Sequence, residues 1–343
     1  MQKRLPAEWE RQSGIMLTWP HHHTDWCPIL AEVETVFVEI SYHISRFEKL
    51  LIVCYDNDHQ THIQQLLAQS ATNMQQVIFH ICKSNDSWAR DHGPISIIND
   101  HQLQIIDFQF NGWGNKYPAD LDNNITQCLF KQNTFLTNKF ERTDFVLEGG
   151  SIESDGMGTL LTTSACLLST QRNPGLSRSE IETELKQKLG FNRLLWLEDG
   201  ALEGDDTDSH IDTLVRFCDP ETIMYQSCDD TNDAHFNSLK AMSEELKELT
   251  TIDNKPYKLV ELPLPKAIYN QQGQRLPASY ANFLIINDAV LVPVYDDQAD
   301  SIVIEKFKTT FNNREIIPIN ACALLQQFGS IHCLTMQLAE GLI

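Results

Sequence analysis

The segment GGSIESDGMGTLL, residues 149–161, contains two short apolar stretches separated by a turn. Two glycines open the segment, and the Asp155-Gly156 pair favours a tight reversal of the chain. Apolar and β-branched residues on both sides of that pair favour extended backbone. The segment is therefore predicted to be a β-hairpin that follows a glycine-containing lead-in.

The same design recurs along the chain. Three further copies are predicted at residues 91–98, 210–225 and 281–294, each with a polar or small lead-in before its apolar strands. A fifth copy can be assembled only from two separate segments, 329–335 and 14–19, which lie near opposite ends of the sequence. Such a split is expected if a circular array closes where the chain ends meet.

Helical periodicity fills the intervals between these hairpins. It is clearest at residues 30–47, 60–74, 177–189 and 233–249, and a further short strand is predicted at 49–53. The lead-ins begin about 60 to 80 residues apart, which is enough for a strand pair, a helix and a return strand. The repeat predicts an α/β fold with five units in a ring. An open doubly wound sheet is the alternative, but no glycine-rich strand-to-helix turn supports it.

Composition limits the kinds of partner that the protein can have. The 343-residue chain is 42% hydrophobic and carries a formal net charge of -21. A surplus of acidic residues disfavours nucleic acid and anionic membranes and favours a small cationic ligand. No Pro/Gly/Ser-rich linker divides the sequence, and the polar stretch at 296–300 is too short to act as one. Residues 1–343 are therefore predicted to form a single domain, and a homo-oligomer is left open.

The cysteines and the first residues bear on the cellular compartment. Nine cysteines are an odd number, and they are scattered without a C-x-x-C pair, which is typical of reduced thiols. The basic residues near the start are not followed by an apolar stretch, and no run of about 18 apolar residues occurs. We expect a cytoplasmic protein that is neither secreted nor membrane-spanning.

The lead-ins carry the residue types that nucleophilic chemistry requires. Cys333 lies in the segment GSIHC, where small residues allow a close backbone approach and a thiolate could be exposed at a strand end. A buried structural cysteine is the alternative interpretation. His210 lies in an acidic cluster, and Asp212 falls on the same face if this segment is extended, because side chains alternate along a strand. The carboxylate could then orient the imidazole or share a ligand with it.

Two other lead-ins supply carboxylates. Asp91 follows Arg90 directly, and a surface ion pair is the alternative to a functional role. Glu148 precedes two glycines that leave room for a ligand against the backbone, although an ordinary turn carboxylate would look the same. Aromatic residues nearby in sequence, Trp88, Trp113 and Tyr117, could stack on a planar cation.

A metal site is disfavoured at the one tract that suggests it. His21, His22 and His23 are followed by Cys27, but consecutive histidines cannot all face one ion in a regular strand. A partner pair at zinc spacing is also missing from the sequence.

Taken in order, these motifs resemble the agmatine deiminase group of guanidine-modifying enzymes, the family that includes the Porphyromonas-type peptidyl-arginine deiminases. The resemblance covers nearly the whole length of the chain. The motifs that carry it are LPAEWE at 5–10, WP at 19–20, SWARDxGP at 87–94, GWG at 112–114, LEGGSI at 147–152, DxHID at 208–212, YxNF at 280–283 and IHCxT at 331–335.

The resemblance implies a fold and a set of roles. The family fold is a five-bladed pseudo-symmetric α/β propeller, the pentein fold. Cys333 matches the nucleophile that forms an amidino-thioether, and His210 matches the general acid/base. Glu148 matches the carboxylate beside that histidine, while Asp91 and Asp212 match the pair that grips the guanidinium.

Three further residues match positions near the substrate. Trp88 and Trp113 resemble the walls of the substrate channel, and Asp208 matches a ligand-proximal position. The chain departs from the family at Ser209, where Gly is usual, and at 327–330, where a Gly-rich loop is usual. We expect the protein to retain the family's reaction despite these changes. The motifs do not determine how the end of the substrate distant from the guanidinium is recognised.

The reaction implied is the hydrolysis of agmatine to N-carbamoylputrescine and ammonia, with neither a metal nor an organic cofactor. An arginine or peptidyl-arginine deiminase with the same chemistry is one alternative, and it would need an additional group, usually an Arg, to bind a carboxylate or a chain. A metal-dependent ureohydrolase that binds its metal through Asp206, Asp208, His210 and Asp212 is another. A non-catalytic polyamine-binding protein is a third, and the presence of Cys333 and His210 argues against it.

Overall fold

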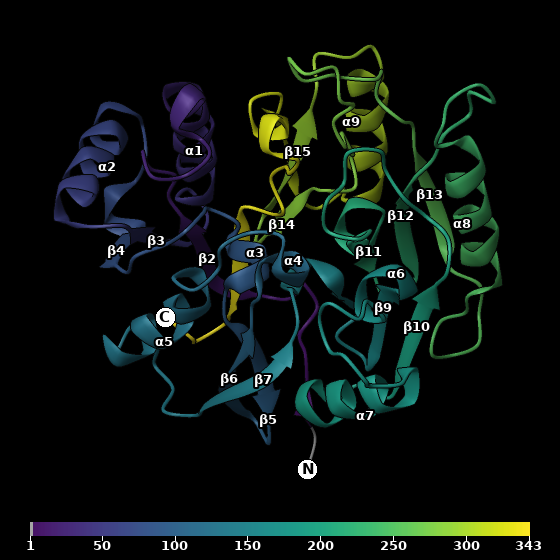
Figure 1. The fold of residues 1–343 in the computed structure, drawn as a ribbon, viewed down its shortest axis with the longest axis horizontal. Coiled ribbons are helices and arrows are strands. Elements are labelled where there is room, and N and C mark those ends of the chain that lie inside the picture. Colours follow the sequence, from purple (N-terminus) through teal and green to yellow (C-terminus); the bar gives the residue numbers. More distant parts are fainter. Residues whose placement is uncertain (1–2) are drawn as a thin grey trace.

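The computed structural model describes residues 3–343, and the strands in this range form five small sheets. Figure 1 shows the longer helices at the periphery of the molecule and the strands inside them. The sheets, in strand order, are β17 (Thr335–Ala339), β2 (Gln12–Thr18), β3 (Lys49–Cys54) and β4 (Val77–Ile81); β1 (Lys3–Arg4), β5 (Ile95–Asn99), β6 (Gln102–Gln109) and β7 (Phe140–Val146); β8 (Glu153–Ser154), β9 (Thr159–Thr163) and β10 (Arg193–Leu197); β11 (Val215–Asp219), β12 (Thr222–Gln226) and β13 (Lys258–Leu262); β14 (Leu284–Ile286), β15 (Ala289–Val294) and β16 (Glu315–Asn320).

Each sheet is built in the same way. It contains an antiparallel pair of consecutive strands, namely β17·β2, β5·β6, β8·β9, β11·β12 or β14·β15, and β1 adds a second antiparallel pairing to β5. A helical crossover then adds a parallel strand, because parallel neighbours need a connection that returns along the sheet. The α/β class and the repeating hairpins predicted from the sequence are confirmed.

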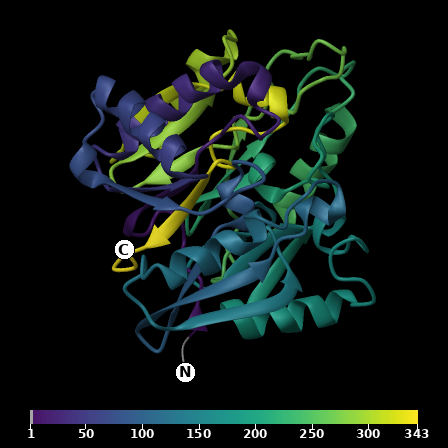
Figure 2. The ribbon, with the colours of Figure 1, turned by 60° about the vertical axis from the view of Figure 1, so that its left-hand side comes forward.

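The split unit is also confirmed. β17 pairs antiparallel with β2, with Thr335 opposite Leu17 and Met336 opposite Met16. Figure 2 shows this yellow C-terminal strand beside the purple N-terminal segment. The two ends of the chain therefore contribute neighbouring strands to one sheet.

The helices of the described chain are α1 (Leu30–Ile44), α2 (Asn57–Gln69), α3 (Ala89–His92), α4 (Gly112–Asn115), α5 (Ile125–Lys131), α6 (Ser164–Leu167), α7 (Arg178–Leu189), α8 (Phe236–Glu248) and α9 (Ala299–Thr310). Periodicity predicted four of them, α1, α2, α7 and α8, with shifts of a few residues at their ends. The start of α7 is set by a capping box, in which the Ser177 side chain accepts from the Glu180 backbone N–H and the Glu180 carboxylate accepts from the Ser177 N–H. Gly190 ends this helix at a φ of 76°, where a side chain would be strained.

The fold places the lead-ins immediately before the antiparallel pairs. Short helical turns at Ala89–His92, Gly149–Ser151 and Ile211–Thr213 precede β5, β8 and β11. Asn282 precedes β14 and Cys333 precedes β17 in the same way. Because the strands behind them are almost fully buried, these turns are held on a rigid base.

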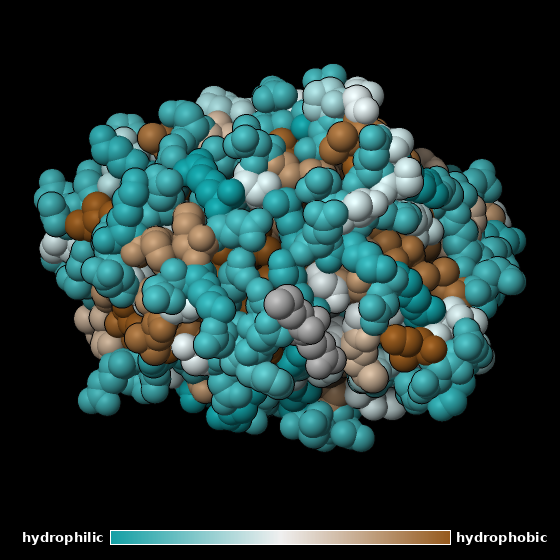
Figure 3. All heavy atoms as spheres, turned by 90° about the horizontal axis from the view of Figure 1, so that it is seen from below, coloured by the Kyte–Doolittle hydropathy of each residue, from teal (hydrophilic) through white to brown (hydrophobic). Residues whose placement is uncertain are grey.

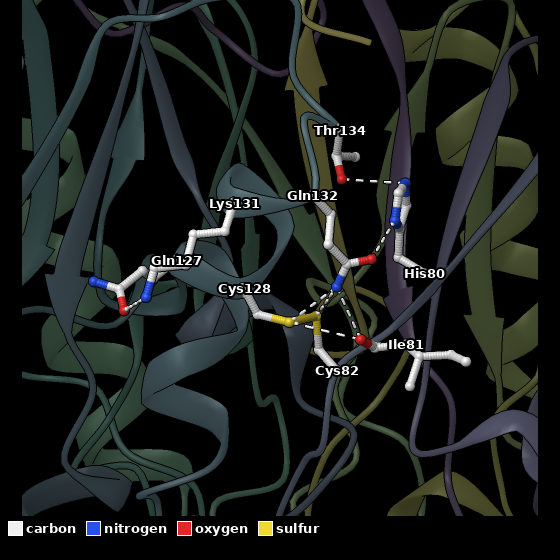
Figure 4. The surroundings of a disulfide bond; sticks show 8 residues. All are labelled: His80, Ile81, Cys82, Gln127, Cys128, Lys131, Gln132 and Thr134. Carbon is white, nitrogen blue, oxygen red and sulfur yellow. Dashed lines mark hydrogen bonds between the residues drawn. A yellow bond between two sulfur atoms is a disulfide. The ribbon is translucent and has the colours of Figure 1, made fainter.

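One sequence prediction about the cysteines is wrong. Cys82, just after β4, forms a disulfide with Cys128 in α5, so not all thiols are reduced. In Figure 4, Gln132 reaches over this bond and its side-chain amide also donates to the Ile81 carbonyl oxygen. The two cysteines lie 46 residues apart without a C-x-x-C pattern, so spacing alone could not reveal the pair.

The disulfide leads to the first testable prediction. Cys82→Ser is expected to lower the free energy of unfolding by about 2–4 kcal/mol, because the bond closes a loop of 46 residues and restricts the unfolded chain. Urea denaturation of the non-reduced variant and wild type would measure the loss, with Cys228→Ser as the free-cysteine control. Thiol titration of the denatured, non-reduced wild type should give seven free thiols, and nine would contradict the bond.

The surface gives no indication of membrane insertion by a helix. None of the helices in the described chain has both the length and the apolar character that a membrane span requires. The face shown in Figure 3 is mainly hydrophilic, with hydrophobic side chains in scattered groups.

Candidate functional site

Cys333 is buried and its position is fixed by Asn282. The Asn282 side-chain oxygen accepts from the backbone N–H groups of His332, at 3.0 Å, and Cys333, at 3.3 Å. Its side-chain amide donates to Cys333 Sγ at 3.2 Å. One amide therefore holds both the backbone and the sulfur of the proposed nucleophile.

Three predicted residues converge on Gly150. A Cβ atom added to this glycine would lie 2.7 Å from His210 Nδ1, 2.8 Å from Asp91 Oδ1 and 3.1 Å from Asp212 Oδ2. The Gly150 N–H donates to Asp91 Oδ1 at 3.0 Å. A side chain at this position would collide with the three functional groups, which explains why glycine stands here. Asp212 Oδ2 is also 3.8 Å from Cys333 Sγ, so the thiol belongs to the same cluster.

Asp91 and Asp212 differ in how they are held. Asp91 accepts from the Trp113 indole N–H at 2.9 Å, yet burial raises the pKa of its carboxyl to about 6. Burial also acts on Asp212, but a hydrogen bond from His332 and the nearby positive charge lower its pKa below the ordinary value. Asp212 Oδ1 has no hydrogen-bond partner although it is buried. Above pH about 6 both carboxylates are ionised and can pair with a cation.

His210 is buried with both ring nitrogens free of hydrogen bonds. Its Nδ1 lies 3.6 Å from Asp91 Oδ1. Burial alone would lower the pKa of this imidazole, but the negative charges facing it, Asp91 first, raise it well above the ordinary value. The histidine therefore carries a proton at neutral pH and can give it to a leaving group.

Glu148 supports His210 and is itself held by Arg172, a residue that sequence reasoning missed. The Arg172 Nε–H donates to both Glu148 oxygens at 2.9 Å, and both side chains are fully buried. Arg172 also donates to Asp208 at 2.6 Å and to the Thr207 carbonyl oxygen at 2.8 Å. The spacing of Arg172 from the motifs gives no signal for this role, because Arg172 lies in the connection between α6 and α7, outside every motif.

Asp208 lies at the rim of the site. Its two oxygens accept from Lys116, at 2.8 Å, and from Arg172. The side chain thus ties the loop before His210 to the rest of the site, and its contact with a substrate stays a prediction. Ser209 has a φ of 64°, a left-handed conformation that glycine adopts without strain.

The cavity beside Cys333 has a volume of about 480 Å³. Trp88 and Trp113 line it together with Asp91 and Cys333, and their contact with a substrate stays a prediction. Its other lining residues include Asp25, Asp86, Asp206 and Tyr117, whose hydroxyl donates to Asp206 at 2.8 Å. No Lys or Arg is found among the residues that line this cavity in the described part of the chain. The cavity therefore favours an elongated cation.

Three donor atoms of Glu148, Cys166 and His210 lie within 4.8 Å of one another, which is close enough to consider a metal ion. Arg172 already pairs with both oxygens of Glu148, so an ion there would face a buried positive charge. We interpret the three residues as an acid–base cluster. The expectation of a metal-free site stays a prediction.

The electrostatics of Cys333 lead to a second prediction. Burial, followed by the negative charges of Asp212 and Asp91, raises the pKa of its thiol well above the ordinary value of 9.0. Alkylation of the substrate-free protein at Cys333 should therefore accelerate continuously as the pH is raised to 9.0. Peptide mapping after iodoacetamide treatment would measure this rate, with the exposed Cys27 as the reference. A rate that levels off below pH 9.0 would contradict the assignment.

A buried thiol close to two carboxylates, with a protonated histidine beside the same glycine, is typical of enzymes in which cysteine attacks a cationic carbon. The sequence model of the Porphyromonas-type peptidyl-arginine deiminase family matches residues 4–339. The chain belongs to this family, as its motifs predicted.

Solved structures and a curated relative agree with this assignment. A structure described as the "Putative Arginine Deiminase from Porphyromonas gingivalis" is 47% identical, with a TM-score of 0.94 and 100% of both chains covered. An agmatine deiminase of C. jejuni, a Cys→Ser variant with substrate bound, is 39% identical, with a TM-score of 0.92 and coverage of 100% of this chain and 98% of the other. A "Putative agmatine deiminase" of Vibrio parahaemolyticus is 33% identical and covers 97% of this chain and 96% of its own length.

Proposed function

We propose that this protein hydrolyses agmatine to N-carbamoylputrescine and ammonia, with Cys333 as the nucleophile. The observation that carries the proposal is the convergence of His210, Asp91 and Asp212 on Gly150, with the Cys333 sulfur beside Asp212. Such a cluster can hold a planar cation by its nitrogens and present its carbon to the thiol.

Substrate binding activates the nucleophile in this mechanism. Asp91 and Asp212 accept hydrogen bonds from the guanidinium nitrogens, and the substrate's charge offsets the two carboxylates that raise the pKa of Cys333. The thiol proton leaves to solvent as the cation enters. The thiolate then attacks the guanidinium carbon and forms a neutral tetrahedral adduct.

His210 acts first as an acid and then as a base. It gives its proton to the departing nitrogen, the C–N bond breaks, ammonia leaves and an amidino-thioether remains on Cys333. The neutral imidazole next takes a proton from water, and the hydroxide formed adds to the same carbon. The C–S bond breaks, the ureido product forms and the released thiolate regains a proton as the product leaves.

The mouth of the cavity favours agmatine over arginine. Asp25, Asp86 and Asp206 line it, and the substrate's second positive charge would lie among these groups. An arginine carboxylate would meet the same acidic groups without a lining Lys or Arg to pair with it. Arginine is the second candidate, because the relative at 47% identity is described as an arginine deiminase.

We also propose that the five sheets close into a five-bladed propeller within one domain. The support is the pairing of β17 with β2 and the meeting of lead-ins from several sheets at one site. Neither a metal nor an organic cofactor has a step in this mechanism.

A product assay tests the proposed function. EDTA-treated protein would be incubated separately with agmatine, arginine and a peptidyl-arginine, and ammonia, urea and ureido products would be scored. Ammonia with N-carbamoylputrescine from agmatine is the expected result. Urea would indicate a metal-dependent hydrolysis instead, and a preference for arginine or peptidyl-arginine would overturn the substrate assignment.

A further inference from the structure

His332 links the substrate carboxylate Asp212 to Glu8, a residue of the N-terminal segment. Its Nδ1 lies 2.7 Å from Asp212 Oδ2, and its Nε2 lies 2.7 Å from Glu8 Oε2. All three side chains are buried. The ring is thus held between two carboxylates. It contacts Oδ2 of Asp212, whereas Oδ1 of the same carboxylate has no hydrogen-bond partner.

Glu8 is fixed by groups from other parts of the fold. Its Oε1 accepts from the Ile285 backbone N–H at 2.7 Å, and its Oε2 accepts from Arg216 Nη2 at 2.8 Å. Burial would raise the pKa of Glu8, but Arg216, His332 and Arg90 lower it. Glu8 and Arg90 line a separate cavity of about 650 Å³ that shares no lining residue with the substrate cavity.

Both contacts of the His332 ring have the length of a hydrogen bond, and at least one of them contains a ring N–H, because a neutral imidazole carries one N–H and an imidazolium carries two. Burial, Arg216 and Arg90 lower the pKa of His332, whereas Glu8 and Asp212 oppose that shift.

We propose that His332, gripped by Glu8, is a positioning residue that keeps Asp212 ionised and directs its free Oδ1 to a guanidinium nitrogen of the substrate. The proposal rests on the proposed function and deepens it, because it names the group that prepares one of the two substrate carboxylates. None of Glu8, His332 and Asp212 is among the residues that line the open cavity. Asp212 lies beside Gly150 and Cys333, and His332 and Glu8 reach the site only through their contacts with Asp212 and with each other.

Other charged groups surround this clamp, which we define as Glu8, His332 and Asp212. They come from several elements, and those facing it are Arg216 of β11, Arg90 and Asp91 of α3, Glu153 of β8, Glu48, Arg314, His210 and Cys333. Arg216 also pairs with Glu153, whose pKa is raised by burial to about 7. A pH profile must therefore be compared between matched variants rather than interpreted alone.

The test is the pH profile of kcat/KM for agmatine in His332→Asn. In wild type, we expect the acidic limb to report Asp91, with a pKa of about 6, while Asp212 stays ionised below that pH. Without the histidine donor the pKa of Asp212 rises, so a second carboxylate is protonated in the same range. The acidic limb should then steepen and move to higher pH, and kcat/KM at neutral pH should fall about 10- to 100-fold.

Three further variants separate positioning from general structural damage. Glu8→Gln should shift the limb in the same direction and decides the question if His332→Asn does not fold. The matched controls are His92→Asn, a buried histidine whose ring meets Thr18, and Glu34→Gln, a buried glutamate that accepts from the Trp19 indole N–H. Both controls should keep the wild-type limb.

Two outcomes would contradict the positioning role of the clamp and the proposed function separately. If both His332→Asn and Glu8→Gln lose activity while the acidic limb of the pH profile stays at its wild-type position, the positioning role of the clamp is wrong. That result would indicate general structural damage instead. A folded wild type that releases no ammonia from agmatine would instead contradict the proposed function.

Discussion

Replacing Cys333 with alanine is expected to lower agmatine turnover at least about a thousandfold, because the covalent step is lost. The substitution removes the sulfur and its contacts with Asn282 and Asp212 but leaves the backbone bonds to Asn282 in place. The fold should therefore persist. Ammonia release under saturating agmatine, together with circular dichroism, would measure both effects.

A buried cysteine elsewhere provides the control for that experiment. Cys54 lies in β3 and is fully buried, and it is not among the residues that line the substrate cavity. Cys54→Ala should cost some stability and retain turnover. Near-normal activity in Cys333→Ala would contradict the covalent mechanism, whatever the control shows. Acid-quenched wild type should in addition carry an amidino adduct at Cys333 that the variant lacks.

Replacing His210 with alanine should reduce turnover by about 10²–10⁴-fold, the usual contribution of a positioned acid or base. The loss applies to both halves of the reaction, since the imidazole protonates ammonia's nitrogen and later deprotonates water. Pre-steady-state mass analysis of His210→Ala should show slow formation of the Cys333 adduct as well as slow decay. The exposed His22, replaced in the same way, should leave turnover unchanged. Loss of activity in the His22 variant with retention in the His210 variant would favour a metal mechanism.

The sequence predicted the helices and strands better than the long-range contacts between them. Apolar alternation and turn residues identified the hairpins, and helical periodicity identified α1, α2, α7 and α8, because these signals are local. The Cys82–Cys128 bond is a contact between a strand end and a distant helix, so no local pattern contains it.

The site shows the same division. Cys333, His210, Asp91 and Asp212 were proposed because their types and lead-in positions match a chemistry and a family, and the structure brings them together. Arg172 was missed, since it lies in the connection between α6 and α7, outside the motifs, and its contact with Glu148 is visible only in the three-dimensional structure. Asn282 lies within a quoted motif, and His332 adjoins the nucleophile, so a signal existed for both. Their partners, which define their roles, come from the three-dimensional structure.

The pairing of β17 with β2 has a consequence for protein synthesis. The ribosome makes β2 near the beginning and Cys333 with β17 near the end, so a growing chain holds its carboxylates and histidine long before it acquires the sulfur. Any product of premature termination upstream of this strand lacks the nucleophile and leaves β2 as an unpaired sheet edge, which is a site for aggregation. Incomplete chains therefore lack both Cys333 and the partner strand that covers this edge of β2.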